Sequence, residues 1–144
     1  MTFRSYGEGT ASEEIASVLF DLGIVYKEAD YHAKATRSLI KSLDMRKQLH
    51  GEAVPHQKTV QTVKLLSEYQ YNNGDVKDAL LSHKFWLKLN IAQHGKSHVD
   101  VAKVHGLIGA DHFGLKKWKD ACKSYENAIK IHRDQVIYTC IIMF

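Results

Sequence analysis

The sequence predicts an all-α protein, a right-handed superhelical solenoid of helix–turn–helix repeats. A glycine followed by a charged residue recurs at Gly7, Gly51 and Gly95, 44 residues apart each time. Each recurrence precedes two stretches in which apolar or small residues fall at helical spacing. One proline and nine glycines among 144 residues leave too few turn formers for the many short strands of a sandwich or barrel.

The first repeat is assigned to residues 11–50, after a segment 1–7 that matches the end of a preceding repeat. The chain is therefore expected to begin within a longer array. The dipeptide Ala29-Asp30 separates two periodic stretches. Their inward positions are Leu19, Leu22, Gly23 and Tyr26 in the first helix, and Ala35, Leu39, Ser42 and Leu43 in the second.

The second and third repeats are assigned to residues 55–94 and 98–134. Pro55 suits a first helical turn, and Ser97–Asp100 has the pattern of a capping box, as has Thr10–Glu13 in the first repeat. The inward positions of the second repeat are Val63, Leu66, Ser67, Gln70, Ala79, His83, Trp86 and Leu87. Those of the third are His105, Ile108, Gly109, His112, Ala121, Tyr125, Ala128 and Ile129.

A small residue occupies the third inward position of every first helix, and an alanine opens the inward face of every second helix. Two helix axes approach closely only where side chains are small, so these positions are expected to meet. The three pairs are Gly23 with Ala35, Ser67 with Ala79, and Gly109 with Ala121.

This pattern resembles the tetratricopeptide repeat. The residues that carry the resemblance are Leu19, Leu22, Gly23, Tyr26, Ala35, Leu39 and Ser42 in the first repeat, and Ile108, Gly109, Trp118, Ala121, Tyr125 and Ala128 in the third. The 44-residue period is similar to the long variant of kinesin light chains and nephrocystin-type arrays, and the resemblance covers roughly residues 1–134. It implies a non-catalytic scaffold or adaptor that binds a protein or peptide in a concave groove.

The resemblance places the first helix of each repeat on that concave face. The stripe beside the inward positions supplies the candidate partner-binding residues, which mix aromatic and charged side chains. They are Phe20, Ile24, Lys27, Lys64, Glu68, Tyr71, Lys103 and Phe113. Such a groove suits a peptide with apolar anchors and some acidic character. The alternative is that the aromatic residues only pad helix contacts.

The sequence predicts no enzyme, cofactor or metal site. It contains no glycine-rich phosphate loop, and its two cysteines have no C-x-x-C spacing. His94 and His98 are four residues apart, but Gly95 and Ser97 are expected to break any helix between them, and a zinc site needs further ligands. His105 and His112 are interpreted as core or half-buried imidazoles.

Charge and hydropathy narrow the classes of partner. The net charge is +4, and the excess cations after residue 115 are interrupted by Asp120 and Glu126, which is typical of a solvated helix face. We therefore expect no nucleic-acid partner.

Two cysteines fit a reducing compartment, and no signal segment or run of about 20 apolar residues is present. The predicted location is the cytoplasm, without a transmembrane segment.

Residues 135–144 are assigned as an apolar C-terminal tail. The run Val136–Ile142 is β-branched, uncharged and free of proline, so it is aggregation-prone where exposed. Three interpretations remain open: a cap on the array, the start of a fourth repeat, or sequence unrelated to the repeats. The tail also supports an alternative function, a structural element that self-associates through its array ends or this tail.

Overall fold

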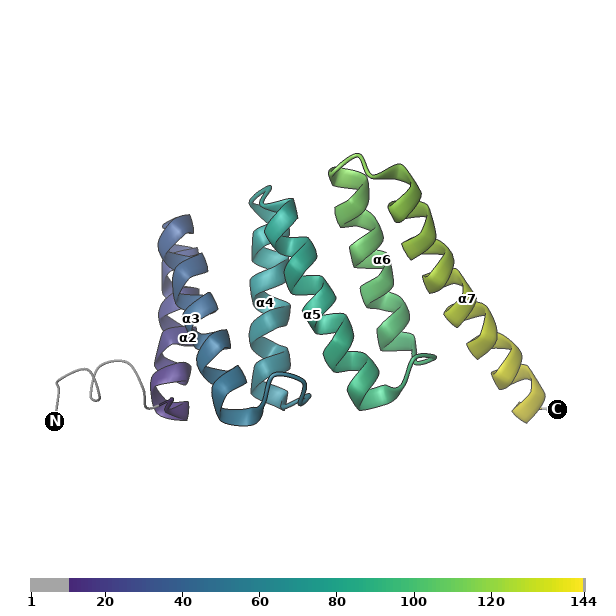
Figure 1. Ribbon diagram of the computed structural model, residues 1–144, viewed down its shortest axis with the longest axis horizontal. Helices are drawn as coiled ribbons and strands as arrows, with labels where there is room; N and C mark the ends of the chain where they lie inside the picture. The colour runs from purple at the N-terminus through teal and green to yellow at the C-terminus, as the bar shows by residue number, and fades with distance from the viewer. Residues whose placement is uncertain (1–10, 144) are drawn as a thin grey trace, which may run out of the picture. The chain divides into compact units, whose positions relative to one another are not determined.

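The computed structural model describes residues 11–143, and these form helices without any strand (Figure 1). The segment 1–7, assigned to a preceding repeat, lies outside the described residues. The helices are α2 (Glu13–Glu28), α3 (His32–His50), α4 (Gln57–Asn72), α5 (Val76–His94), α6 (Val99–Gly114) and α7 (Trp118–Met143). The all-α prediction is confirmed. The chain divides into two compact units, Met1–Thr62 and Val63–Phe144, with the boundary inside α4.

The same turn closes each helical hairpin. An amide three residues beyond each first helix donates to a carbonyl five residues back, from Tyr31 to Tyr26, from Asp75 to Gln70 and from Lys117 to His112. This is the long hydrogen bond of a Schellman motif, which needs a left-handed residue before it. Asp30, Gly74 and Lys116 supply that residue, with φ between 60° and 83°. The repeat in the sequence is thus also a repeat in backbone geometry.

In the N-terminal unit, α2 packs on α3. The Ser42 hydroxyl donates across the interface to the Ala16 carbonyl at 2.7 Å, and both residues are buried. Gly23 lies so close to Leu39 that a Cβ atom at this position would be 2.7 Å from Leu39 Cγ. The N-cap of α2 is Ser12, whose hydroxyl accepts from the Ile15 amide at 3.4 Å. The cap is therefore two residues later than the start of the predicted capping box.

In the C-terminal unit, α5 packs on α6 and α6 on α7. Val101, Ala102 and Ile131 form a buried cluster, against which Leu87 and Ile91 pack. Figure 1 shows α6 and α7 as an antiparallel pair. Gly109 faces the ring of Tyr125, whose nearest atom would lie 2.8 Å from an added Cβ. In the third repeat, α6 and α7 therefore come close where Gly109 meets Tyr125.

The predicted inward positions agree best with the structure in the second repeat. All four residues assigned to the first helix of that repeat are buried, as are the four assigned to α3. In α2, Leu22 is exposed and Ala16 is buried instead. In α7, Tyr125 and Ile129 are exposed and Ile131 is buried. Helix α7 packs on α6, and a single neighbour covers a narrower stripe of a helix than two neighbours do.

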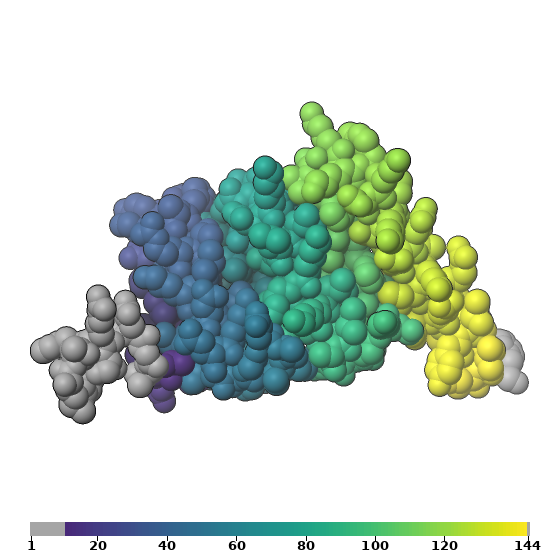
Figure 2. Space-filling model, viewed as in Figure 1, coloured from purple at the N-terminus to yellow at the C-terminus, as the bar shows by residue number. Residues whose placement is uncertain are grey.

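The boundary predicted at residue 135 does not end a helix, since α7 continues through it to Met143. No glycine or proline interrupts this stretch, and β-branched residues lower helix propensity only slightly. Figure 2 shows these last turns in yellow at the edge of the C-terminal unit. Their apolar side chains face solvent, with Ile141 70% exposed. None of the helices in residues 11–143 combines the length and hydrophobicity of a bilayer-spanning segment.

Candidate functional site

A hollow of about 330 Å³ opens in the C-terminal unit, lined by residues of α4, α5 and α6. Four of the eight predicted binding residues line it, namely Lys64, Glu68, Tyr71 and Lys103. Because α4 turns by about 100° per residue, positions 64, 68 and 71 fall within roughly 60° of one another. The other lining residues are Ser67, Asn72, His83, Trp86 and Leu107.

The wall of the hollow combines an aromatic surface with two cations. Tyr71 is 43% exposed and Trp86 is almost fully buried, so the hollow offers one reachable ring and one fixed ring. Lys64, Lys103 and Glu68 are all exposed and all line the hollow. The three charged side chains sum to +1, so the hollow favours a partner with negative charge.

A buried histidine–aspartate pair underlies this hollow. His83 Nδ1 and Asp111 Oδ2 lie 2.5 Å apart, and both side chains are almost fully buried. The second carboxylate oxygen, Asp111 Oδ1, is buried without a hydrogen-bond partner. Sequence analysis placed His83 on the inward face but missed Asp111. The pair joins α5 to α6 and holds His83 at the edge of the hollow.

Three predicted residues, Phe20, Ile24 and Lys27, belong to α2 in the N-terminal unit and do not line the hollow. The guanidinium of Arg46 lies 5.2 Å from the centre of the Phe20 ring, within range of a cation–π contact. Phe20 is therefore a packing residue, as in the alternative considered for the aromatic residues. Ile24 is half-buried, and Lys27 pairs with Glu28 at 3.7 Å.

The eighth predicted residue, Phe113, is 62% exposed and lies outside the hollow. Its ring meets the Trp118 ring edge-on, with centroids 5.5 Å apart, across the turn between α6 and α7. Ten residues separate Phe113 from Lys103, which turns the helix about 80° away from the lysine's face. At 1.5 Å per residue, Phe113 also lies about 15 Å along α6 from Lys103, at the opposite end of the helix.

Arg46 is the centre of a polar network in the N-terminal unit. Its side chain is 3% exposed, lies 3.4 Å from Glu13, donates to the Lys58 carbonyl and contacts the Thr62 hydroxyl. Glu13 also accepts from His50 at 3.0 Å and from Lys58 at 3.1 Å. Burial raises the pKa of Glu13, but the hydrogen bonds from His50 and Lys58 and the charges of Arg46 and Lys58 outweigh it and lower the pKa to about 2. This network fixes α2, α3 and the start of α4.

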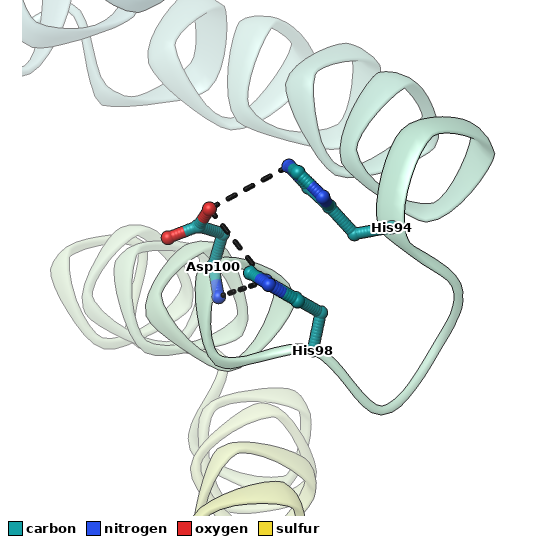
Figure 3. A group of neighbouring side chains, drawn as sticks. All are labelled: His94, His98 and Asp100. Carbon is teal, nitrogen blue, oxygen red and sulfur yellow. Dashed lines mark hydrogen bonds and ion pairs between the residues drawn. The ribbon is translucent and has the colours of Figure 1, made fainter.

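A second group of polar side chains lies between α5 and α6 (Figure 3). Asp100 Oδ2 is 3.6 Å from His94 Nε2 and 3.6 Å from His98 Nδ1. The two imidazole rings stack with centroids 4.2 Å apart. One potential ligand atom from each residue lies within 4.8 Å of the other two. The sequence predicts that the helix ends near Gly95, and the structure confirms it. The sequence gives no indication that the loop after Gly95 brings the His94 and His98 imidazoles into contact.

Comparison with known proteins gives a likeness of fold. No family model matches the sequence, and no curated protein matches it. Among solved structures, the chain is similar to BtubC (BKLC) from P. vanneervenii, with a TM-score of 0.70 and 18% sequence identity over 87% of this chain. The match covers 49% of that protein, so this chain spans about half its length. The likeness shows an all-helical repeat fold.

Proposed function

We propose that this chain is a tetratricopeptide-type interaction module in which the hollow of α4, α5 and α6 binds a short peptide segment. The peptide would carry one apolar side chain next to a carboxylate. The 44-residue sequence pattern, the three equivalent turns and the repeat fold of a kinesin-light-chain-like neighbour support the repeat assignment. The right-handed superhelix and concave groove of that repeat family belong to the proposal, as does a non-catalytic role without a cofactor.

The size and lining of the hollow indicate the kind of anchor. At about 330 Å³ it lies at the lower end of the range of about 300–1,000 Å³ for ligand pockets, which suits one inserted side chain. Tyr71 and Trp86 provide the aromatic surface that dominates binding energy at interfaces. Because Trp86 and the His83–Asp111 pair are buried, this part of the site is formed before binding and its ordering cost is small.

The charges indicate the flanking group. Lys64 and Lys103 stand on two different helices at the same hollow, and Glu68 offsets one of them. A carboxylate beside the apolar anchor would lie near both lysines. The coincidence of an aromatic wall with two lysines at one hollow is the observation that carries the proposal.

Two free cysteines, Cys122 and Cys140, are both exposed, which supports a reducing compartment such as the cytoplasm.

The test is selection of peptides from a random display library on the immobilised chain, followed by affinity measurement on purified peptides. We expect enriched sequences with an aromatic or aliphatic residue next to an acidic one. Tyr71→Ala and the pair Lys64→Glu with Lys103→Glu should each weaken binding about tenfold or more, because they remove the anchor contact and invert the local charge.

Matched control variants distinguish binding at the hollow from nonspecific peptide binding elsewhere on the chain. Phe113→Ala removes an exposed ring outside the hollow, and Lys119→Glu inverts an exposed charge on α7. Both variants should bind the selected peptides as the parent chain does. Peptides that bind all four variants equally, or a selection without any shared pattern, would contradict the proposal.

Self-association remains a second candidate function because the end of α7 is apolar and exposed. The exposed apolar residues there are Val136, Ile137, Tyr138, Ile141, Ile142 and Met143. A second copy of the chain could cover them and remove their apolar area from water.

Light scattering over a range of concentrations tests this second function. Ile137→Lys with Ile141→Lys keeps the length of α7 and keeps Gln135, which donates to the Ser97 carbonyl at 2.7 Å. We expect a parent mass that rises with concentration and a doubly substituted protein that stays monomeric and still binds the selected peptides. The chain with residues 135–144 deleted should likewise stay monomeric. A parent chain that is still monomeric at about 100 μM would contradict this second function.

A further inference from the structure

We infer that His94, His98 and Asp100 form a binding site for a divalent transition-metal ion, with zinc as the best-suited ion. The three side chains come from the last residue of α5, the residue that caps α6, and the first turn of α6. The site lies within the C-terminal unit and does not share a residue with the hollow.

The distances fit one ion between the three side chains. Ligands of a tetrahedral zinc ion at bond lengths of about 2.0–2.2 Å lie roughly 3.3–3.6 Å from one another. The Asp100 carboxylate oxygen lies 3.6 Å from each imidazole nitrogen. All three potential ligand atoms are within 4.8 Å of one another, so small side-chain movements bring them into coordination. Figure 3 shows the two rings and the carboxylate converging between the two helices.

The ligand types select the class of ion. Two imidazoles and one carboxylate suit zinc and other late first-row ions, whereas calcium and magnesium prefer sites made only of oxygen. Three protein ligands leave one tetrahedral position for water. Metal binding also requires unprotonated imidazoles, so the affinity should fall in acid.

The loop holds two of the ligands in place before any ion binds. Gly95 turns the chain at φ 83°, directly after His94. The Gln135 side chain of α7 donates to the Ser97 carbonyl at 2.7 Å and ties down the residue before His98. One contact opposes the ion, because His98 Nδ1 accepts from the Asp100 amide at 3.1 Å and would have to leave it. We therefore expect weaker binding than at a closed, four-ligand structural zinc site.

The preceding repeat junction provides an internal comparison. His50 and His56 stack there with centroids 3.5 Å apart, and His56 Nδ1 accepts from the Lys58 amide at 3.3 Å. A stacked pair and an imidazole cap thus occur at both junctions and belong to the architecture of the repeat. One difference is the second residue after the cap, which is Lys58 at one junction and Asp100 at the other. At the first junction the carboxylate that contacts the pair is Glu13, which contacts His50 and also pairs with Arg46 and Lys58. At the second junction Asp100 contacts both imidazoles, which makes the three side chains a set of potential ligands.

Calorimetric titration of the metal-stripped full chain with zinc chloride near pH 7.5 tests the inference. We expect one zinc site, and we expect Asp100→Lys and His94→Ala each to weaken it at least tenfold. Mutation of residues that only hydrogen-bond to metal ligands lowers metal affinity about 10- to 100-fold. These two variants remove a ligand itself, so the loss should be at least as large. Asp100→Lys reproduces the lysine of the other junction and should keep the parent circular dichroism spectrum.

His56→Ala is the matched control, since it breaks the other stacked pair and should leave zinc affinity unchanged. A second readout is thermal unfolding, in which saturating zinc should raise the midpoint of the parent but not of Asp100→Lys. Unchanged zinc affinity in Asp100→Lys and His94→Ala would assign the ion to other histidines and overturn the inference. Absence of binding at about 1 mM zinc would overturn it as well.

Discussion

Replacing His83 with alanine is expected to lower the free energy of unfolding by about 3–5 kcal/mol. The substitution leaves the Asp111 carboxylate buried without its partner 2.5 Å away. Asp111 is fully buried and its other oxygen already has no hydrogen-bond partner, so the loss of His83 removes the side-chain partner of this buried carboxylate. Removing one member of a buried pair is among the most destabilising single changes in a protein core.

Denaturant unfolding followed by circular dichroism measures this effect, and a double-mutant cycle separates it from lost packing. In the double variant His83→Leu with Asp111→Ala, no buried charge is left unpaired. It should therefore be more stable than the single variants His83→Leu and Asp111→Ala predict by simple addition, although it lacks both polar groups. If the double variant loses as much as His83→Leu and Asp111→Ala combined, the pair does not act as a coupled unit.

The fold was predictable because the repeat appears at several levels at once. The 44-residue spacing, the periodic apolar positions and the small residues at close approach all indicate the same helical hairpin. The structure adds a left-handed turn residue at Asp30, Gly74 and Lys116. Only one of these three is a glycine, so glycine placement alone does not reveal the turn.

The site was only partly predictable, for reasons of helix geometry. Lys64, Glu68 and Tyr71 line the hollow together because residues three, four and seven apart share a helix face. Phe113 lies outside the hollow, so a binding role for it stays a prediction of the sequence. The carboxylate of Asp111 gave no signal, since its partner His83 is 28 residues away on another helix.

The histidine group shows a different limit of the sequence. Helical spacing predicts contacts within one helix, but His94 and His98 lie on opposite sides of a turn at Gly95. Their contact depends on the path of the loop, which the hydrogen bond from Gln135 to Ser97 holds in place. Such a contact follows from tertiary structure and has no periodic signature.

The second large effect is expected at Gly23, where substitution by alanine should destabilise the protein by about 1–3 kcal/mol. An added Cβ would lie 2.7 Å from Leu39 Cγ and 2.8 Å from Leu39 Cδ2. Leu39 is fully buried, so its side chain cannot turn outward into solvent. The gain in helix propensity from glycine to alanine, about 1 kcal/mol, opposes this strain but does not cancel it.

Gly106 in α6 is the matched control, because its added Cβ would meet nothing within 4 Å apart from its chain neighbours and the backbone of its own helix. Gly106→Ala should therefore stabilise the protein by about 0.5–1 kcal/mol in the same denaturation assay. Gly109→Ala should fall between the two, since the ring it meets belongs to Tyr125, which is 39% exposed and has room to turn. Equal stabilities for Gly23→Ala and Gly106→Ala would show that α2 and α3 do not need a small residue where they approach. We expect Gly23→Ala to be the least stable of the three variants, Gly109→Ala to be intermediate and Gly106→Ala to be the most stable. That order would show that the burial of the opposing side chain decides how much an added methyl group destabilises the helix contact.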